Sequence, residues 1–267
     1  MNGGWAPLLA SEWRKVATTK MAWVLAAIAV AYSSINAGVL VLVATGSIPD
    51  LPSGDANMLE DPDYITTIIG QASTAATFVL ILGIIAVTGE YRHMTITSTL
   101  LSTPRRGRVL TAKMGLYGLL GALIAVITLV AVTTLVAVAL LWFEHAPITA
   151  STIATVGIGS LAGFVLYAVL GVSLGALIRS QIAAIIIAMV WVLLLEAILV
   201  LALPAVAKWL PGGALSAVMD VGLEADLSGA MTQADRLPPW GGALVLLAYS
   251  VVLALFALRT TMRRDIT

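Results

Sequence analysis

The 267-residue chain has no cysteine, and only 10% of its residues are charged. The absence of cysteine excludes disulfides, thiolate metal sites and cysteine nucleophiles. Soluble domains contain about 25% charged residues, whereas this chain is 60% hydrophobic. A soluble fold of this composition would expose large apolar patches and aggregate. The sequence therefore predicts a protein whose solvent is a lipid bilayer.

Patterns for nucleotide binding and catalysis are absent as well. The chain has no G-x-x-x-x-G-K-[ST] loop to hold phosphates and no H-E-x-x-H metal motif. His93 and His145 fall in different predicted loops on opposite faces of the membrane, so they cannot share a metal ion. Hydrolysis within a membrane would need paired acids or a serine with a base. Glu196 is a single acid within the apolar runs, and it cannot supply either arrangement. We therefore predict no enzyme activity and no cofactor in this chain itself.

Six apolar runs reach about 20 residues, the length that a helix needs to cross the hydrocarbon core. Helices are expected because backbone groups facing lipid must be hydrogen-bonded internally, and the runs lack the alternation of barrel strands. The predicted spans are Met21–Thr45, Thr66–Thr88, Leu116–Trp142, Ser151–Ile178, Gln181–Leu203 and Trp240–Leu258. Glu196 is then the only charged residue inside a span. The predicted fold class is an all-α membrane protein with one transmembrane domain, residues 1–267.

The charges are strongly segregated along the chain. No basic residue lies between Lys20 and Arg92, whereas five acids lie between the first two runs. Cytoplasmic loops of membrane proteins collect lysine and arginine. An N-terminus inside the cell places 12 of the 14 basic residues in the cytoplasm and ten of the 14 acids outside. The pattern predicts that both termini are cytoplasmic.

Residues 5–19 precede the first span and have a helical pattern of their own. Their bulky side chains recur at helical spacing, and the polar ones lie elsewhere around the helix. This predicts an amphipathic helix in the cytoplasmic interface, with tryptophan at the level of the headgroups. Such a helix is either a simple anchor or a lever that links a cytoplasmic partner to the first span.

The connection 89–113 between spans 2 and 3 is longer than the 2–8 residues that commonly join helices in a bundle. Thr95 can cap a short helix that Pro104 would end, and Arg92, Arg105 and three further basic residues flank it. Such a loop either docks a partner or only sets the topology and binds anionic lipid. Its ordered apolar residues favour docking.

A second irregular segment, 204–239, follows span 5. It is interrupted by Pro211 and two glycines and contains an apolar stretch, Ala214–Val221, that is too short to span. This pattern predicts short extracellular or re-entrant helices.

The chain resembles the ABC-2 type permease family, the membrane subunits of certain ATP-binding cassette exporters, over essentially its whole length. The resemblance rests on LLASEWRKVATTKMAW, on GEYRHMTITSTLLSTPRRGRVLTAK, and on six spans with a broken outer segment before the last. It implies an interfacial connecting helix at 5–19 and a cytoplasmic coupling helix within 89–113 that seats in a cleft of an ATPase. The family often has glycine after the histidine of this loop, where the chain has Met94.

The resemblance also implies the partners. ATP and magnesium would bind to a separate ATPase subunit, and two permease copies, identical or paralogous, would surround a central pathway. The expected location is a bacterial plasma membrane.

Carried over by position, the resemblance assigns two sets of residues. The residues expected to border the ATPase are Glu12, Arg14, Glu90, Arg92, His93, Thr95, Thr97 and Leu100. The family lines its pathway with spans 1, 2 and 5, and the corresponding polar residues are Tyr32, Asn36, Gln71, Thr74 and Glu196.

Glu196 has two interpretations. An acid within the membrane costs roughly 2.5–3.5 kcal/mol on insertion scales and usually faces protein or a watery cavity. It could contact a cationic or polar substrate, or carry a proton. It could equally be a protonated or hydrogen-bonded acid that fastens helices together.

Four glycines on span 4, Gly159, Gly163, Gly171 and Gly175, allow helices to approach closely. These glycines do not stay on one face of the helix, which favours packing within one subunit over an interface between two subunits.

The leading hypothesis is therefore a permease that exports a hydrophobic or amphipathic compound when two ATPases close. The alternative is a proton-coupled secondary transporter that uses Glu196. That class commonly has internal repeats and broken central helices, whereas this sequence shows no repeat and its predicted break lies outside the membrane. A non-transporting partner or immunity subunit is a further alternative.

Overall fold

The computed structural model describes residues 5–47, 58–95, 105–143, 148–219 and 237–260. These residues form helices, with no strand among them. Six of the helical segments are long and apolar enough to cross a membrane. They are Lys20–Ala44, Pro62–Arg92, Arg106–Trp142, Ala150–Leu177, Gln181–Ala202 and Pro239–Arg259. The predicted all-α fold with six spanning helices is confirmed for the described part of the chain.

The chain begins with helix α1 (Trp5–Thr18), which confirms the predicted helix before the first span. Helix α2 (Lys20–Ala44) follows after the single residue Thr19, whose extended backbone separates the two helices. Side-chain hydroxyls of Thr18 and Thr19 bind the carbonyls of Arg14 and Lys15, and so compete with the helical backbone bonds where α1 ends.

The second span is made of three pieces. A short 3₁₀ turn, η1 (Met58–Glu60), precedes α3 (Pro62–Gly70), which continues through a 3₁₀ segment, η2 (Gln71–Ala75), into α4 (Ala76–Arg92). The start of α3 follows from local chemistry, because Asp61 Oδ1 accepts the Asp63 N–H and Pro62 occupies the first helical position.

The third and fourth spans are the uninterrupted helices α6 (Arg106–Trp142) and α7 (Ala150–Leu177). The fifth consists of α8 (Gln181–Val190), a π-helical segment η3 (Trp191–Leu195) and α9 (Glu196–Ala202). Two short helices, α10 (Pro204–Ala207) and α11 (Pro211–Met219), precede the sixth span, α12 (Pro239–Arg259). The short helices predicted in the segment 204–239 are thus present, as far as the described residues extend.

Three details differ from the sequence prediction. The connection assigned to 89–113 is shorter, because α4 continues to Arg92 and α6 already begins at Arg106. Glu196 is not the only charged residue in the spanning helices, since these extensions include Glu90 and Lys113. Interruptions also lie within spans 2 and 5, at η2 and η3, and not only in the segment between spans 5 and 6.

The physical reason for the longer helices is that a helix need not end where the hydrocarbon ends. At 1.5 Å per residue α6 is roughly 55 Å long, whereas the hydrocarbon core is only about 30 Å thick. Its 37 residues therefore extend well beyond the apolar layer. Charged residues therefore do not mark the end of such a helix.

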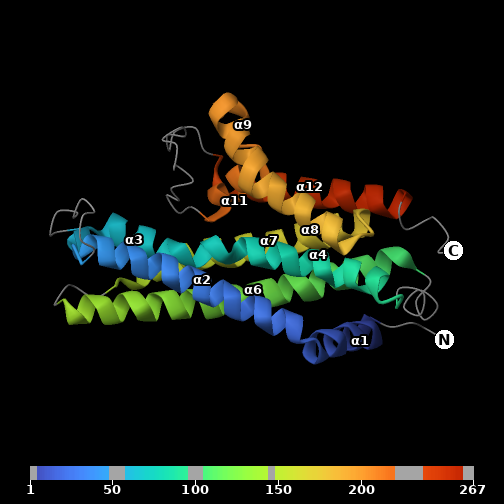
Figure 1. Ribbon diagram of the computed structural model, residues 1–267, viewed down its shortest axis with the longest axis horizontal. Helices are drawn as coiled ribbons and strands as arrows, with labels where there is room; N and C mark the ends of the chain where they lie inside the picture. The colour runs from blue at the N-terminus through green and yellow to red at the C-terminus, as the bar shows by residue number, and fades with distance from the viewer. Residues whose placement is uncertain (1–4, 48–57, 96–104, 144–147, 220–236, 261–267) are drawn as a thin grey trace.

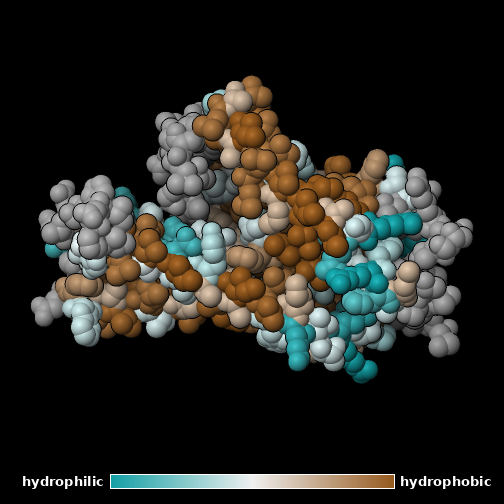
Figure 2. Space-filling model, in the orientation of Figure 1, coloured by the Kyte–Doolittle hydropathy of each residue, from teal (hydrophilic) through white to brown (hydrophobic). Residues whose placement is uncertain are grey.

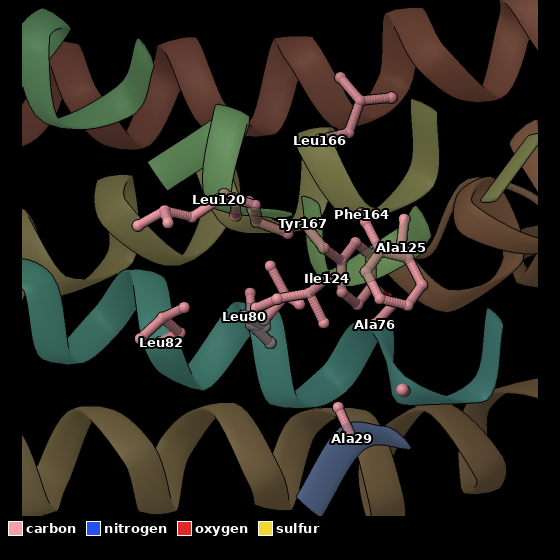
Figure 3. Close-up of a cluster of buried hydrophobic side chains, with 14 of the residues drawn as sticks. Ala29, Ala76, Leu80, Leu82, Leu120, Ile124, Ala125, Phe164, Leu166 and Tyr167 are labelled. Carbon is pink, nitrogen blue, oxygen red and sulfur yellow. The ribbon is translucent and has the colours of Figure 1, made fainter. Parts of the chain in front are cut away.

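Helix α7 forms the centre of the bundle, and α4, α6 and α12 pack against it (Figure 1). Figure 3 shows buried side chains from α2, α4, α6 and α7 in one cluster. The labelled members are Ala29, Ala76, Leu80, Leu82, Leu120, Ile124, Ala125, Phe164, Leu166 and Tyr167. All of them are buried, so this is where the core lies.

Glycines explain how closely α7 packs. A Cβ atom added at Gly171 would lie 2.2 Å from the Leu80 carbonyl oxygen of α4, and one at Gly175 would lie 2.6 Å from that of Ile84. Gly159 and Gly163 instead meet Met219 of α11. The glycines on span 4 therefore pack within the chain, as predicted.

The fifth span is the least buried of the six. Its α9 end projects from the rest of the bundle (Figure 1), and hydrophobic residues cover the surface there (Figure 2). Hydrophilic residues gather instead at the end of the bundle where α1 and the end of α4 lie (Figure 2). We call this the basic end, defined by α1, the last turn of α4 and the first two turns of α6.

Candidate functional site

Four charged side chains meet at the basic end and come from three different helices. Glu12 and Lys15 belong to α1, Glu90 to the last turn of α4 and Lys113 to the start of α6. Glu12, Glu90 and Lys113 are buried, at 1%, 6% and 2% exposed, whereas Lys15 is half-buried. We call these four residues the ionic cluster.

Each carboxylate of the ionic cluster is bound by both lysines. Lys113 Nζ donates to Glu12 Oε2 at 2.5 Å and to Glu90 Oε1 at 2.9 Å. Lys15 Nζ donates to Glu12 Oε1 at 2.6 Å and to Glu90 Oε1 at 2.5 Å. The two negative and two positive charges cancel, which offsets the cost of removing them from water.

Lys113 is held by a further bond, because its Nζ also donates to the Ala86 carbonyl at 3.2 Å. It therefore uses all three of its donor positions within the protein. Glu90 Oε2, by contrast, is buried with no hydrogen-bond partner among the described residues. The ionic cluster thus balances in charge while one acceptor remains open.

The pKa values of the two α1 residues reflect this pairing. Burial alone would raise the pKa of Glu12, but the ammonium groups of Lys113 and Lys15 outweigh it and hold that pKa below the ordinary 4.5. Burial alone would lower the pKa of Lys15, and its bonds to Glu12 and Glu90 reverse this, so the pKa lies above 10.5. Both residues are therefore charged around neutral pH.

The helix turn beside Glu90 ends in a Schellman motif. Thr95 N–H binds the Glu90 carbonyl at 2.9 Å, and Met94 N–H binds that of Tyr91 at 3.3 Å. Met94 accordingly has a φ of +56°, the left-handed conformation that favours glycine. The chain adopts here the turn that a glycine would form, with methionine in its place.

The residues predicted to border an ATPase separate into two groups. Glu12 and Glu90 are buried in the ionic cluster and face inward, whereas Arg14, Arg92 and His93 are exposed. Arg92 Nη1 lies 3.4 Å from Gln181 Oε1, at the start of α8. Thr95 takes part in the turn after α4, and Thr97 and Leu100 lie outside the described residues.

The face that α1 turns toward the bundle contains Glu12 and Val16, both buried. Trp5 and Trp13 are about half exposed, and the Arg108 guanidinium lies 5.8 Å from the centre of the Trp5 ring. Helix α1 therefore turns one charged residue, Glu12, toward the bundle and leaves its two tryptophans exposed.

Four of the predicted pathway residues lie along α2 and η2. The rings of Tyr32 and Phe78 meet edge to face at 5.4 Å. Asn36 donates to the Tyr32 carbonyl, and Thr74 donates to the carbonyl of Gln71, which is itself buried. In a bilayer, carbonyls released by an irregular helix must find other donors, so Thr74 supports η2 whether or not it also lines a path.

Glu196 is turned toward a different part of the molecule. It is 7% exposed, and its Oε2 accepts the backbone N–H of Gly212, in the first turn of α11, at 2.8 Å. Tyr167 of α7 lies close enough to interact with it electrostatically. The structure therefore places the other four predicted pathway residues on two elements that pack against each other, α2 and η2, but places Glu196 beside α7 and α11.

Sequence reasoning missed the two lysines of the ionic cluster. Glu12 and Lys15 are three residues apart on a predicted helix, which is a recognisable signal for an ion pair. Lys113 lies 101 residues from Glu12 along the chain, so only the tertiary fold reveals that pair. Among the described residues, no three histidines, aspartates or glutamates group as they would to hold a metal ion.

Together these features define a class of protein, a helical protein with six helices able to span a membrane and an ionic cluster at one end of the bundle. No family model matches the chain, and no curated protein matches it.

Proposed function

We propose that this chain is the transmembrane subunit of an ATP-binding cassette transporter. It forms the substrate pathway, works with separate ATPase subunits and a second permease copy, and exports a hydrophobic or amphipathic compound across a bacterial plasma membrane. The basic end faces the cytoplasm in this proposal, in keeping with the distribution of basic residues.

The observation that supports the proposal most is the attachment of α1. This helix is too short to span, yet the buried ionic cluster fixes it to the last turn of α4 and the first two turns of α6. A simple surface anchor needs no such bond to two spanning helices. A helix that receives force from a partner and passes it to the spanning helices needs such bonds.

The test is association with an ATPase, and Arg92 is the suitable residue. Glu90 is unsuitable because reversing its charge would break the ionic cluster. We expect Arg92→Glu to reduce copurification of the ATPase and ATP-dependent transport while the permease still folds, because Arg92 is exposed. Arg259→Glu, the same change at an exposed residue that ends α12, is the matched control.

Equal copurification and transport for Arg92→Glu, Arg259→Glu and the unsubstituted chain would contradict the proposal. So would transport that persists in vesicles lacking any ATPase.

A second candidate is a proton-coupled transporter that uses Glu196. One observation favours it, because spans 2 and 5 are interrupted at η2 and η3, and Glu196 directly follows η3. Secondary transporters often bind their substrates at such discontinuous helices. Transport driven by a pH gradient alone, and lost in Glu196→Gln, would establish this candidate instead.

A further inference from the structure

We propose that the ionic cluster joins α1, the end of α4 and the start of α6 into one rigid unit, and that Lys113 is the positioning residue that holds it together. This inference rests on the proposed function, because the unit would transmit movement of the ATPase-facing connection to α2. It gives Glu12 and Glu90 an inward role rather than contact with the ATPase.

The arrangement of bonds makes the unit rigid. The two lysines bridge the two carboxylates in a closed ring, so no helix can leave without separating two ion pairs. Lys113 is the more buried of the two lysines, with its side chain 3% exposed against 40% for Lys15. Removing one member of a buried ionic group leaves its partners uncompensated in a medium of low dielectric constant.

The neighbouring helix α8 is joined to this unit differently. Arg92 reaches Gln181 through one hydrogen bond on the exposed surface, and the Arg179 guanidinium lies 5.8 Å from the centre of the Tyr91 ring. Exposed interactions of this kind contribute little free energy. Because these polar contacts are weaker than the buried ionic cluster, we expect relative motion to be easier between α4 and α8 than between α1, α4 and α6.

Motion of the unit reaches the membrane through Thr19. Because this residue alone separates α1 from α2, rotation of α1 must displace the start of the first span. The tilt of α2 would then follow the position of the connection 93–105.

The absence of cysteine allows a direct test by spin labelling. One label pair, at Arg14→Cys and His93→Cys, reports on α1 and α4, and a second pair, at Arg14→Cys and Ile182→Cys, reports on α1 and α8. All three positions are exposed. In the permease–ATPase complex we expect trapped ATP to leave the first distance unchanged and to alter the second. A first distance that changes as much as the second overturns the inference.

The Lys113→Met variant tests the positioning role. We expect it to broaden the Arg14–His93 distance distribution, and in the complex to abolish the ATP-dependent change between α1 and α8 while the ATPase stays bound. Lys113→Arg keeps the charge and should restore a narrow distribution. Lys208→Met is the matched control, since it makes the same change near α10 and should leave the distribution narrow. An unbroadened distribution in Lys113→Met overturns the inference.

Two arrangements keep the test decisive. If Lys113→Met does not fold, the half-buried Lys15→Met takes its place, and a distribution as narrow as in the unsubstituted chain overturns the inference. If no ATPase binds, the proposed function fails, but the distributions measured in the isolated permease still support or overturn the rigid unit.

Discussion

In the part of the chain that the structure describes, acidic residues are buried in two places, and they are held in different ways. At the basic end, Glu12 and Glu90 share two lysines and belong to a charge-balanced group that joins three helices. At the junction of α9 and α11, Glu196 accepts a backbone N–H from Gly212. The first arrangement uses charge to hold helices together, whereas the second uses a carboxylate to hold a turn of backbone.

The local backbone differs in the same way. The helices around the ionic cluster are regular, and they position charges at the ends of α4 and α6. Glu196 instead follows the π-helical segment η3, where the wider turn changes the direction in which later side chains point. A regular helix presents the charges of the ionic cluster to other helices, whereas the irregular η3 precedes the side chain that binds the first turn of α11.

The largest expected effect comes from Lys113→Met. Two buried carboxylates would lose the ammonium that binds both, and breaking a buried ionic group in this way typically costs about 3–5 kcal/mol. The midpoint of thermal unfolding in detergent should fall accordingly. Lys15→Met should cost less, because exposed ion pairs contribute about 1 kcal/mol or less and the Lys15 side chain is 40% exposed.

Both Lys113→Met and Lys15→Met remove one positive charge, but from lysines buried to different depths. A difference between their unfolding midpoints therefore reports the effect of burial. Lys208→Met should leave the midpoint unchanged. Equal losses in Lys113→Met and Lys15→Met would show that the depth of burial does not determine the strength of the ionic cluster.

The next largest effect concerns the second site. An added Cβ at Gly212 would lie 2.1 Å from Glu196 Oε2, so Gly212→Ala must displace the carboxylate from the N–H that it accepts. Leaving a buried polar group unpaired costs about 1–3 kcal/mol, and unfolding should occur at lower temperature. Gly115→Ala is the control, because no atom lies within 4 Å of an added Cβ there. If both alanine variants unfold alike, Gly212 does not hold Glu196 in place.

A smaller effect, of opposite sign, is expected at the turn after Glu90. A residue other than glycine in the left-handed conformation is strained by roughly 1–2 kcal/mol. Replacing it with glycine removes this strain, but the greater freedom of glycine in the unfolded chain offsets part of the gain. Met94→Gly should therefore stabilise the protein by up to about 1 kcal/mol, measured as a higher unfolding midpoint. Met94→Ala keeps the strain and should show no gain. A lower midpoint for Met94→Gly would mean that the methionine side chain makes a contact worth more than the strain.

Sequence reasoning gave the spanning helices well where charge was absent. The predicted start at Gln181 agrees with the structure, and the start at Met21 differs from Lys20 by one residue. The errors lie where charges occur at helix ends, since Thr88 was predicted to end a helix that reaches Arg92, and Leu116 to begin one that starts at Arg106. Charge locates the membrane boundary but does not end the helix.

The candidate sites were less predictable, for a related reason. Residue type and membrane depth identified Glu196 as unusual, and the family resemblance drew attention to Glu12 and Glu90. Neither argument identified partners that only the tertiary fold brings close. The partner of Glu196 is a backbone N–H, which every residue except proline possesses, so no side-chain pattern could reveal it. Helix irregularities such as η3 likewise leave no clear composition signal in an apolar run.

The smallest expected effect is a dependence of stability on pH that comes from Glu12 of the ionic cluster. The pKa of Glu12 is raised by burial and lowered more by Lys113 and Lys15, so only the difference between these opposing influences acts on stability. Because the folded-state pKa lies below 4.5, the stabilisation is complete above pH 4.5 and is lost as the pH falls through the folded-state value. The unfolding midpoint of the unsubstituted chain should therefore exceed that of Glu12→Gln near neutral pH, and the difference should shrink on acidification below pH 4.5. A difference that stays constant or grows below this pH would mean that Glu12 is not charged in the folded protein, and the charge balance of the ionic cluster would have to be reassigned.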